Sequence, residues 1–318
     1  MRTALPLFGY ALAVAWWMPA PLARLTAPGI GPRLGLAAWL AALVSVLASA
    51  TAALLFLVRA AVAGWSGLAE VVCRSVAGHS CDQTVYQSAA FELVLGLIAV
   101  VAALTAGVLA WRYGRSVRRA RRQTLAHAEV ARIVGRALAD GVPAPRRGTA
   151  ALVIDGGEPV AYCLSGRPAT IVLSSGALEV LDPAQLGAVL AHERAHLAGR
   201  HHLLIAVTRG LAAALPAVPL FARGLDEVAR LAEMCADDAA ARRIGRRALT
   251  GALLAMATGT AVPAAALGAM ACAVSARLNR LLEVPRRARD ARYALALSAL
   301  LIALPLAPGL AALAATRA

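Results

Sequence analysis

Four stretches of this chain are long and apolar enough to cross a lipid bilayer, which restricts the chain to membrane-protein folds. They cover residues 4–20, 34–58, 93–111 and 293–314. A transmembrane helix needs about 20 predominantly apolar residues. Hydrophobic residues make up 60% of the 318 positions, whereas soluble domains usually hold about 45–50%. We therefore expect a mainly α membrane protein with about four transmembrane helices.

The first apolar run, residues 4–20, fits either a signal peptide or a retained helix. Only Arg2 precedes the run, and the two tryptophans at 16 and 17 suit a membrane interface. Pro19 and Pro21 close the run without forming a strong cleavage signal. We favour a retained transmembrane helix.

The arginine residues indicate which way the helices cross the membrane. All 32 basic residues are Arg, against 17 acidic residues, which gives a net charge of +15. Six of them lie between 112 and 122, directly after the third apolar run, and positive residues beside a span mark its cytoplasmic side. Counting from this cluster places both termini outside the cell. The complete absence of Lys indicates a bacterium with a GC-rich genome.

The same arginines do not indicate that the protein binds nucleic acid. The chain holds only 5 Trp, 5 Tyr and 4 Phe, and the Arg clusters flank apolar segments instead of forming a separate basic domain. Membrane topology explains the charge better, so we expect the lipid bilayer as partner and no nucleic acid.

The apolar and basic segments together divide the chain into three regions. We expect a three-helix transmembrane region, a cytoplasmic catalytic domain and a C-terminal transmembrane helix, at 1–111, 112–290 and 291–318. The polar segment 59–92 would form an external loop, where a disulfide between Cys73 and Cys81 could form. Two unpaired thiols are the alternative. Cys163, Cys235 and Cys272 are expected to behave as small buried hydrophobes.

An H-E-x-x-H motif, His192 to His196, lies in the predicted cytoplasmic domain. Two imidazoles four positions apart on a helix lie on one face and can bind one Zn²⁺, while Glu193 can reach a water on that metal. The helix has a clear start, with Asp182 as N-cap and Pro183 at the first position, and should run to about Ala198. One zinc per chain is expected.

The segments around the motif predict a small α+β domain. A helix is expected over 112–140, followed by short strands at 149–154, 160–164 and 169–173. The strand at 160–164 could lie at the sheet edge and pair with an extended substrate. Residues 203–222 would form a membrane-dipping hairpin or a buried helical pair.

A catalytic zinc needs a third protein ligand, and Glu233 is the best candidate. Asp237 lies one turn further along the same predicted helix and could orient one imidazole through its distal N–H. The alternative for both is a solvated acidic face near Arg230 and Arg242. His201 and His202 are candidates for stabilising the transition state.

These residues resemble a known signature. His192–His196 followed by Glu233 and Asp237 is similar to the H-E-x-x-H … E-x-x-A-D pattern of integral-membrane gluzincins, which include HtpX-like, CaaX-protease-like and BlaR/MecR-type peptidases. The resemblance covers roughly residues 142–285. It implies that His192, His196 and Glu233 are ligands, that Glu193 is the general base and that Asp237 supports them.

The order of spans most resembles the BlaR/MecR type, but this sequence departs from it twice. Those sensors carry a large extracellular penicillin-binding domain after the last span, whereas this sequence ends at Ala318. The family also commonly has an Asp after the motif helix, where this chain has His201 and His202.

Three functions are compatible with the sequence. The first is a multi-pass zinc endopeptidase of the cell membrane that cleaves a transcriptional repressor or another regulatory protein at the cytoplasmic face. The second is an HtpX-like protease for quality control of membrane proteins. The third is a non-catalytic scaffold or transporter, against which Glu193 and Glu233 both argue. A transporter would also be expected to hold charges within several spans, and the first three apolar runs hold none.

Overall fold

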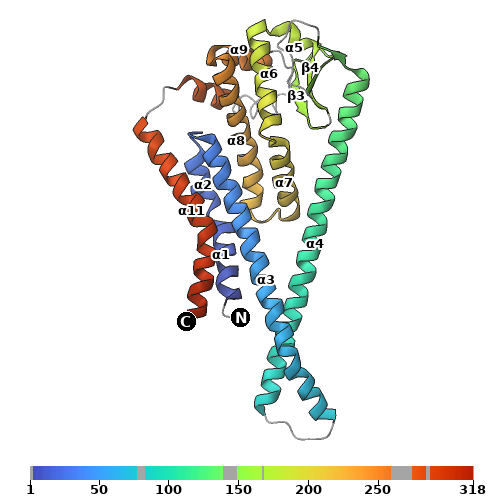
Figure 1. Ribbon diagram of the computed structural model, residues 1–318, viewed down its shortest axis with the longest axis vertical. Coiled ribbons are helices and arrows are strands. Elements are labelled where there is room, and N and C mark those ends of the chain that lie inside the picture. The colour runs from blue at the N-terminus through green and yellow to red at the C-terminus, as the bar shows by residue number, and fades with distance from the viewer. Residues whose placement is uncertain are drawn as a thin grey trace.

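The structure is a computed structural model that describes residues 3–76, 83–138, 149–166, 168–258, 274–283 and 287–317. Long helices fill one half of the molecule, and a small sheet with shorter helices fills the other (Figure 1). Both termini lie away from the sheet, short of the far ends of α3 and α4 (Figure 1). The mainly α membrane fold predicted from the sequence is confirmed.

Four helices near the termini form an apolar bundle: α1 (Ala4–Trp17), α2 (Pro19–Thr26), α3 (Pro32–Val76) and α11 (Arg287–Arg317). Trp39 of α3 is fully buried, and its indole N–H donates to the Thr26 hydroxyl at 3.3 Å. Three helical segments are long and apolar enough to span a membrane, at 32–62, 93–134 and 288–310. The bent pair α1 and α2, which turns by 48°, would make a fourth. The expectation of about four spans is therefore met.

The polar segment 59–92 differs from its prediction as an external loop. Helix α3 continues through most of it to Val76, and α4 begins at Gln83. The segment holds no proline, and a polar composition alone does not end a helix. Cys81 lies outside the described residues, as do the contacts of the Cys73 side chain, so the disulfide stays a prediction.

Helix α4 (Gln83–Val134) runs without a break through the third apolar run and the arginine cluster. Its 52 residues make a helix about 78 Å long. The predicted end at Asp140 was wrong. The chain leaves the helix after Val134 because Arg136 and Ala137 pair as strand β1 with Val153 and Leu152, which overrides the local helix propensity.

The sheet has the strand order β1-β2-β4-β3. Strand β2 (Thr149–Ile154) is parallel to β4 (Ala169–Ser174), and β3 (Ala161–Leu164) pairs antiparallel with β4. The three predicted strands are confirmed to within one residue at each end, and β3 lies at the edge as predicted. Strand β1 (Arg136–Ala137) was not foreseen.

The predicted motif helix is confirmed as α6 (Pro183–Ala198). The Asp182 carboxylate accepts from the Gln185 backbone N–H at 2.8 Å, and the Gln185 side chain accepts from the Asp182 N–H at 3.1 Å. This reciprocal cap satisfies two N–H groups that a helix start leaves unpaired. Leu190 of α6 packs against Ile171 and Leu173 of β4, and α5 (Ser175–Val180) joins that strand to the helix.

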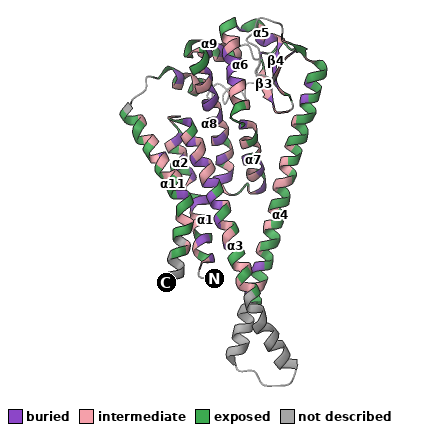
Figure 2. Cartoon of the chain, viewed as in Figure 1, coloured by how far each residue is buried: buried purple, intermediate pink, exposed green. Residues whose placement is uncertain are grey.

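Helices α7 (His201–Ala214), α8 (Pro219–Ile244) and α9 (Arg246–Thr258) follow the motif helix. Residues 203–222 therefore form parts of two successive helices, a feature that the membrane-dipping hairpin and the buried helical pair predicted from the sequence have in common. Gly210 of α7 lies so close to Tyr113 of α4 that an added Cβ would sit 2.8 Å from the ring. Buried residues gather in α6 and α8, whereas much of α4 is exposed (Figure 2).

Candidate metal centre

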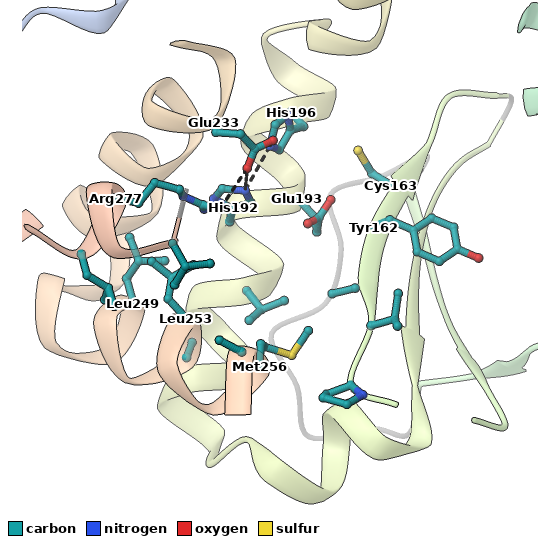
Figure 3. A pocket seen from close by; sticks show the side chains of 18 of the residues that line it. Tyr162, Cys163, His192, Glu193, His196, Glu233, Leu249, Leu253, Met256 and Arg277 are labelled. Carbon is teal, nitrogen blue, oxygen red and sulfur yellow. Dashed lines mark hydrogen bonds and ion pairs between the residues drawn. The ribbon is translucent and has the colours of Figure 1, made fainter. Parts of the chain in front are cut away.

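Three side chains from two helices converge in the half of the molecule that holds the sheet and the shorter helices. His192 and His196 project from α6, and Glu233 reaches them from α8 (Figure 3). The two Nε2 atoms lie 3.0 Å apart, and the Glu233 carboxylate oxygens lie 3.4 Å from Nε2 of His192 and 3.3 Å from Nε2 of His196. Helices α6 and α8 pack side by side. This packing brings Glu233 close to His192 and His196, although at least 37 positions separate it from either histidine in the sequence.

This geometry fits a tetrahedral metal ion. Bonds of about 2.0–2.1 Å from zinc to nitrogen and oxygen place neighbouring donor atoms about 3.4 Å apart. One donor atom from each of His192, His196 and Glu233 lies within 4.8 Å of the others. Two imidazoles and a carboxylate also leave a fourth position open, as a catalytic ion requires. The three residues named from the sequence as ligands can therefore hold one ion without rearrangement of the backbone.

The surroundings of His192 favour a positive charge on its imidazole. Burial lowers the pKa of the imidazole, but hydrogen bonds to Asp237 and Glu233 outweigh burial and raise the pKa to about 9. Burial raises the pKa of Glu233, and its bonds to His192 and His196 overcome this and hold the pKa well below its usual range. These side chains therefore favour a positive charge between them, and a metal cation would bind in place of a proton.

Asp237 holds His192 from the side away from Glu233. Its carboxylate lies 3.1 Å from Nδ1 of His192 and is fully buried. Arg277 donates two hydrogen bonds to the same carboxylate, at 2.8 and 2.6 Å, and its third nitrogen lies 3.2 Å from Glu233. Burial raises the pKa of Asp237, but the bonds from Arg277 outweigh it and lower the pKa. The buried carboxylate is thus ionised and fixed in place.

His201 contacts His196 as Asp237 contacts His192. Nδ1 of His201 lies 3.0 Å from Nδ1 of His196, and His201 is buried. Burial, reinforced by His196, lowers the pKa of His201 to about 4, so its imidazole is neutral at neutral pH. Arg200, with φ of +50°, makes the left-handed turn that brings the start of α7 back toward α6. His192 thus has an anionic partner, Asp237, whereas His196 has a neutral partner, His201.

Glu193 lies on the pocket side of α6 and faces strand β3. The Glu193 carboxylate and the thiol of Cys163 lie opposite each other in Figure 3. Burial first, and then the Glu193 charge, raise the pKa of Cys163 well above its usual range. Cys163 is half-buried and unpaired, so it is not the buried hydrophobe that the sequence predicted, whereas Cys235 is. Cys272 lies outside the described residues.

A cavity of about 800 Å³ opens beside these groups. Residues Pro159–Cys163 along β3 form one wall, and α9 forms another with Leu249, Leu253 and Met256 (Figure 3). His192, Glu193, His196 and Glu233 line the cavity between the two walls. An edge strand, an apolar wall and the candidate metal centre therefore share one cavity.

The structure separates the two histidines that the sequence grouped together. His202 lines the cavity, whereas His201 contacts His196. Nδ1 of His202 is buried and has no hydrogen-bond partner among the described residues. Burial and then Arg200 lower the pKa of His202, which favours the neutral imidazole. His202, but not His201, is thus placed where a substrate could reach it.

Sequence reasoning missed two residues of this site. Arg277 lies 40 positions after Asp237 in a segment with several arginines, and no motif distinguishes it from its neighbours. Cys163 lies in a strand that was predicted correctly, and alternation along the strand could have shown that it shares the Ala161 face. The sequence alone therefore does not show that Arg277 or Cys163 lies next to the motif.

Comparison with known proteins agrees with this geometry over part of the chain. Residues 124–221 match the model of peptidase family M48. A "Protease HtpX homolog" from Acidiphilium cryptum (strain JF-5) is 36% identical over 105 residues, which are 31% of this chain and 34% of that relative. No solved structure matches. The match to the family holds the H-E-x-x-H helix and ends before Glu233, which the fold itself brings to the motif. Residues 124–221 of this membrane protein are thus similar to part of peptidase family M48, and together these findings support an HtpX-like membrane metallopeptidase.

Proposed function

We propose that this protein is a zinc-dependent endopeptidase of the cell membrane, with one Zn²⁺ held by His192, His196 and Glu233. The observation that carries the proposal is the convergence of these three donor atoms at tetrahedral spacing beside Glu193. When bound there, zinc would lower the pKa of a coordinated water to about 7 and polarise the scissile carbonyl.

The side chains of this site suit the proton transfers of peptide hydrolysis. Glu193 would take a proton from the attacking water and pass it to the leaving amine, which is the usual role of a buried carboxylate beside the nucleophile. His202, neutral and aimed into the same cavity, is our candidate for donating to the oxyanion.

Strand β3 is the proposed binding edge for substrate. An extended peptide could pair with the free edge of Ala161–Leu164 by main-chain hydrogen bonds, which carry little sequence preference. The apolar wall of Leu249, Leu253 and Met256 would then accept an apolar side chain of that peptide. This arrangement supports an enzyme of broad specificity.

The site is proposed to face the cytoplasm, inside a catalytic domain at 112–290. The arginine cluster at 112–122 supports this orientation, because it lies on α4 between the apolar run and the sheet. Membrane proteins with unfolded or juxtamembrane segments are the substrates that fit best, and the likeness to an HtpX homologue agrees with this general role. Cleavage of a repressor by a BlaR/MecR-type mechanism stays a prediction of the sequence.

The proposal is tested by removing and restoring the metal. Purified full-length protein is expected to contain about one zinc per chain and to degrade an unfolded protein such as casein. A chelator should abolish the degradation, and added zinc should restore it. The Glu233→Ala variant is expected to lose both zinc and activity. Wild-type protein that degrades casein equally well without zinc would refute the proposal.

His201 is expected to tune the affinity for zinc. Replacing it with alanine removes the partner of His196 Nδ1 and should weaken zinc binding about 10–100-fold. His201→Asp would supply a carboxylate instead and should strengthen binding beyond wild type, because an anionic acceptor makes the imidazole a better donor to the metal. Competition with a fluorescent chelator measures both.

His202→Ala is the matched control for this experiment. It removes a neighbouring imidazole that lines the cavity without contacting His196, so zinc affinity should stay at the wild-type value. Equal zinc affinity in His201→Ala and wild type would show that the contact between His201 and His196 has no role in metal binding.

A further inference from the structure

A second cavity, of about 730 Å³, lies away from the metal centre. Its walls come from three parts of the chain that are far apart in sequence: the loop Pro28–Gly31 between α2 and α3, the end of α8 and start of α9, and the segment before and at the start of α11. The lining is mostly polar and holds four arginines: Arg242, Arg246, Arg280 and Arg289. The proposed peptidase function uses none of these residues.

Two of the four arginines are engaged in the fold. Arg280 donates to Asp238 at 2.6 Å and to the Gly29 carbonyl at 2.9 Å, which ties the α2–α3 loop to α8. Arg246 donates to the Leu281 carbonyl at 3.2 Å. These bonds use backbone oxygens and one carboxylate, and they fix the walls of the cavity.

Arg242 and Arg289 can still donate to a ligand, although the Arg289 guanidinium lies over the Tyr293 ring, 5.8 Å from its centroid. Both side chains are exposed, and neither forms an ion pair with a carboxylate among the residues that the structure describes. Glu283 and Asp290 also line the cavity, and Asp238 is neutralised by Arg280. With Arg246, three arginines therefore face two free carboxylates, so the cavity favours an anion that can approach the arginines.

The position of the cavity relative to the spans indicates where that anion comes from. The candidate span in α3 begins at Pro32, directly after the loop that lines the cavity, and the candidate span in α11 begins at Ala288, next to Arg289. In a bilayer crossed by these two helices, the cavity would lie at the depth of lipid headgroups. Basic pockets at this depth on the cytoplasmic side are suited to anionic headgroups.

We propose that this cavity binds the phosphate of an anionic phospholipid, with Arg242 and Arg289 as its main contacts. A phosphate oxygen accepts well from guanidinium groups, and a headgroup held here would link the α2–α3 loop, α8 and α11. The acyl chains would continue into the bilayer along the apolar segments of α3 and α11. This inference is independent of the proteolytic function.

Lipid retention tests the proposal. The full-length protein is reconstituted in nanodiscs made of an equimolar mixture of phosphatidylglycerol and phosphatidylcholine, extracted in detergent, and its bound lipids are counted by native mass spectrometry. Wild type is expected to retain phosphatidylglycerol, and the Arg242→Gln/Arg289→Gln variant about 20-fold less, because each arginine near a headgroup contributes a several-fold gain. Arg280 is left unchanged because its bonds to Asp238 and to the Gly29 carbonyl connect two walls of the cavity.

Two further variants show whether the cavity itself is responsible. Arg118→Gln/Arg119→Gln removes the same charge from exposed positions of α4 and should retain as much phosphatidylglycerol as wild type. Arg242→Lys/Arg289→Lys keeps the charge and should retain most of the phosphatidylglycerol. Equal loss in both glutamine variants would overturn the proposal, because any exposed arginine pair would then suffice. Unchanged retention in Arg242→Gln/Arg289→Gln would overturn it too.

A competition arm distinguishes a lipid from a free phosphate. Inorganic phosphate and glycerol 3-phosphate are added during extraction, and neither is expected to displace the bound phosphatidylglycerol at millimolar concentration. Displacement by inorganic phosphate alone would identify a soluble anion as the ligand and overturn the assignment to lipid.

Discussion

The Glu193→Gln variant is expected to retain about one zinc per chain and to lose proteolytic activity by about a thousandfold, within the range of about 10²–10⁴ that general acid–base catalysis contributes. Glutamine keeps the size of the side chain and can still contact Cys163, but it cannot accept the proton of the attacking water. The metal stays because its donor atoms belong to His192, His196 and Glu233. Zinc content and the initial rate of casein cleavage measure the two effects.

Glu179→Gln is the control for this variant. Glu179 is an exposed carboxylate on α5, outside the cavity, and its replacement should change neither zinc nor rate. If Glu193→Gln keeps zinc and also keeps the wild-type rate, then Glu193 is not the general base. If it loses zinc, its role is structural, and the assignment of a general base fails.

Local sequence signals were sufficient for the motif helix and its surroundings. Asp182, Pro183 and Gln185 set the start of α6, because a capping box depends on residues three positions apart. The strands before it were found because alternating apolar runs and turn residues are also local. The third candidate ligand, Glu233, needed the resemblance to a known signature as well as the requirement for three donors.

Features that depend on tertiary packing could not be predicted from local sequence. Strand β1 forms because β2 offers it a partner, although residues 136–137 continue a good helical pattern. The contact between His201 and His196 depends on the left-handed turn at Arg200, which the residue type does not demand. Arg277 joins the site from a segment that is distant in sequence, and an arginine among many others gives no sign of the buried carboxylate it will meet.

The Arg277→Gln variant is expected to be the most destabilising of the charge changes considered for this protein. Asp237 is fully buried, and Arg277 donates two hydrogen bonds to its carboxylate, whose other charged neighbour is His192 at 3.1 Å. Removing one partner of a buried ion pair costs about 3–5 kcal/mol, and His192 offsets only part of the charge that Arg277 balances. Because Asp237 also orients His192, zinc affinity should fall about 10–100-fold. Urea unfolding of metal-free protein in detergent measures the first effect, and chelator competition measures the second.

The neighbouring pair of Arg280 and Asp238 provides the matched control. It joins the same two segments three residues away from Arg277, but Asp238 is 29% exposed where Asp237 is fully buried. Water can solvate the carboxylate that remains, so Arg280→Gln should cost only about 1–2 kcal/mol and leave zinc affinity unchanged.

A double variant separates the buried charge from the lost packing. Arg277→Gln/Asp237→Asn leaves two neutral side chains, so it should recover most of the stability that Arg277→Gln loses through the buried charge. It should not recover zinc affinity, because the neutral amide of Asn holds the His192 N–H less strongly than a carboxylate does. Equal free energies of unfolding for Arg277→Gln and Arg280→Gln would show that burial of Asp237 does not set the cost. Recovery of both stability and zinc affinity in the double variant would show that His192 needs a hydrogen-bond acceptor at this position but not a charge.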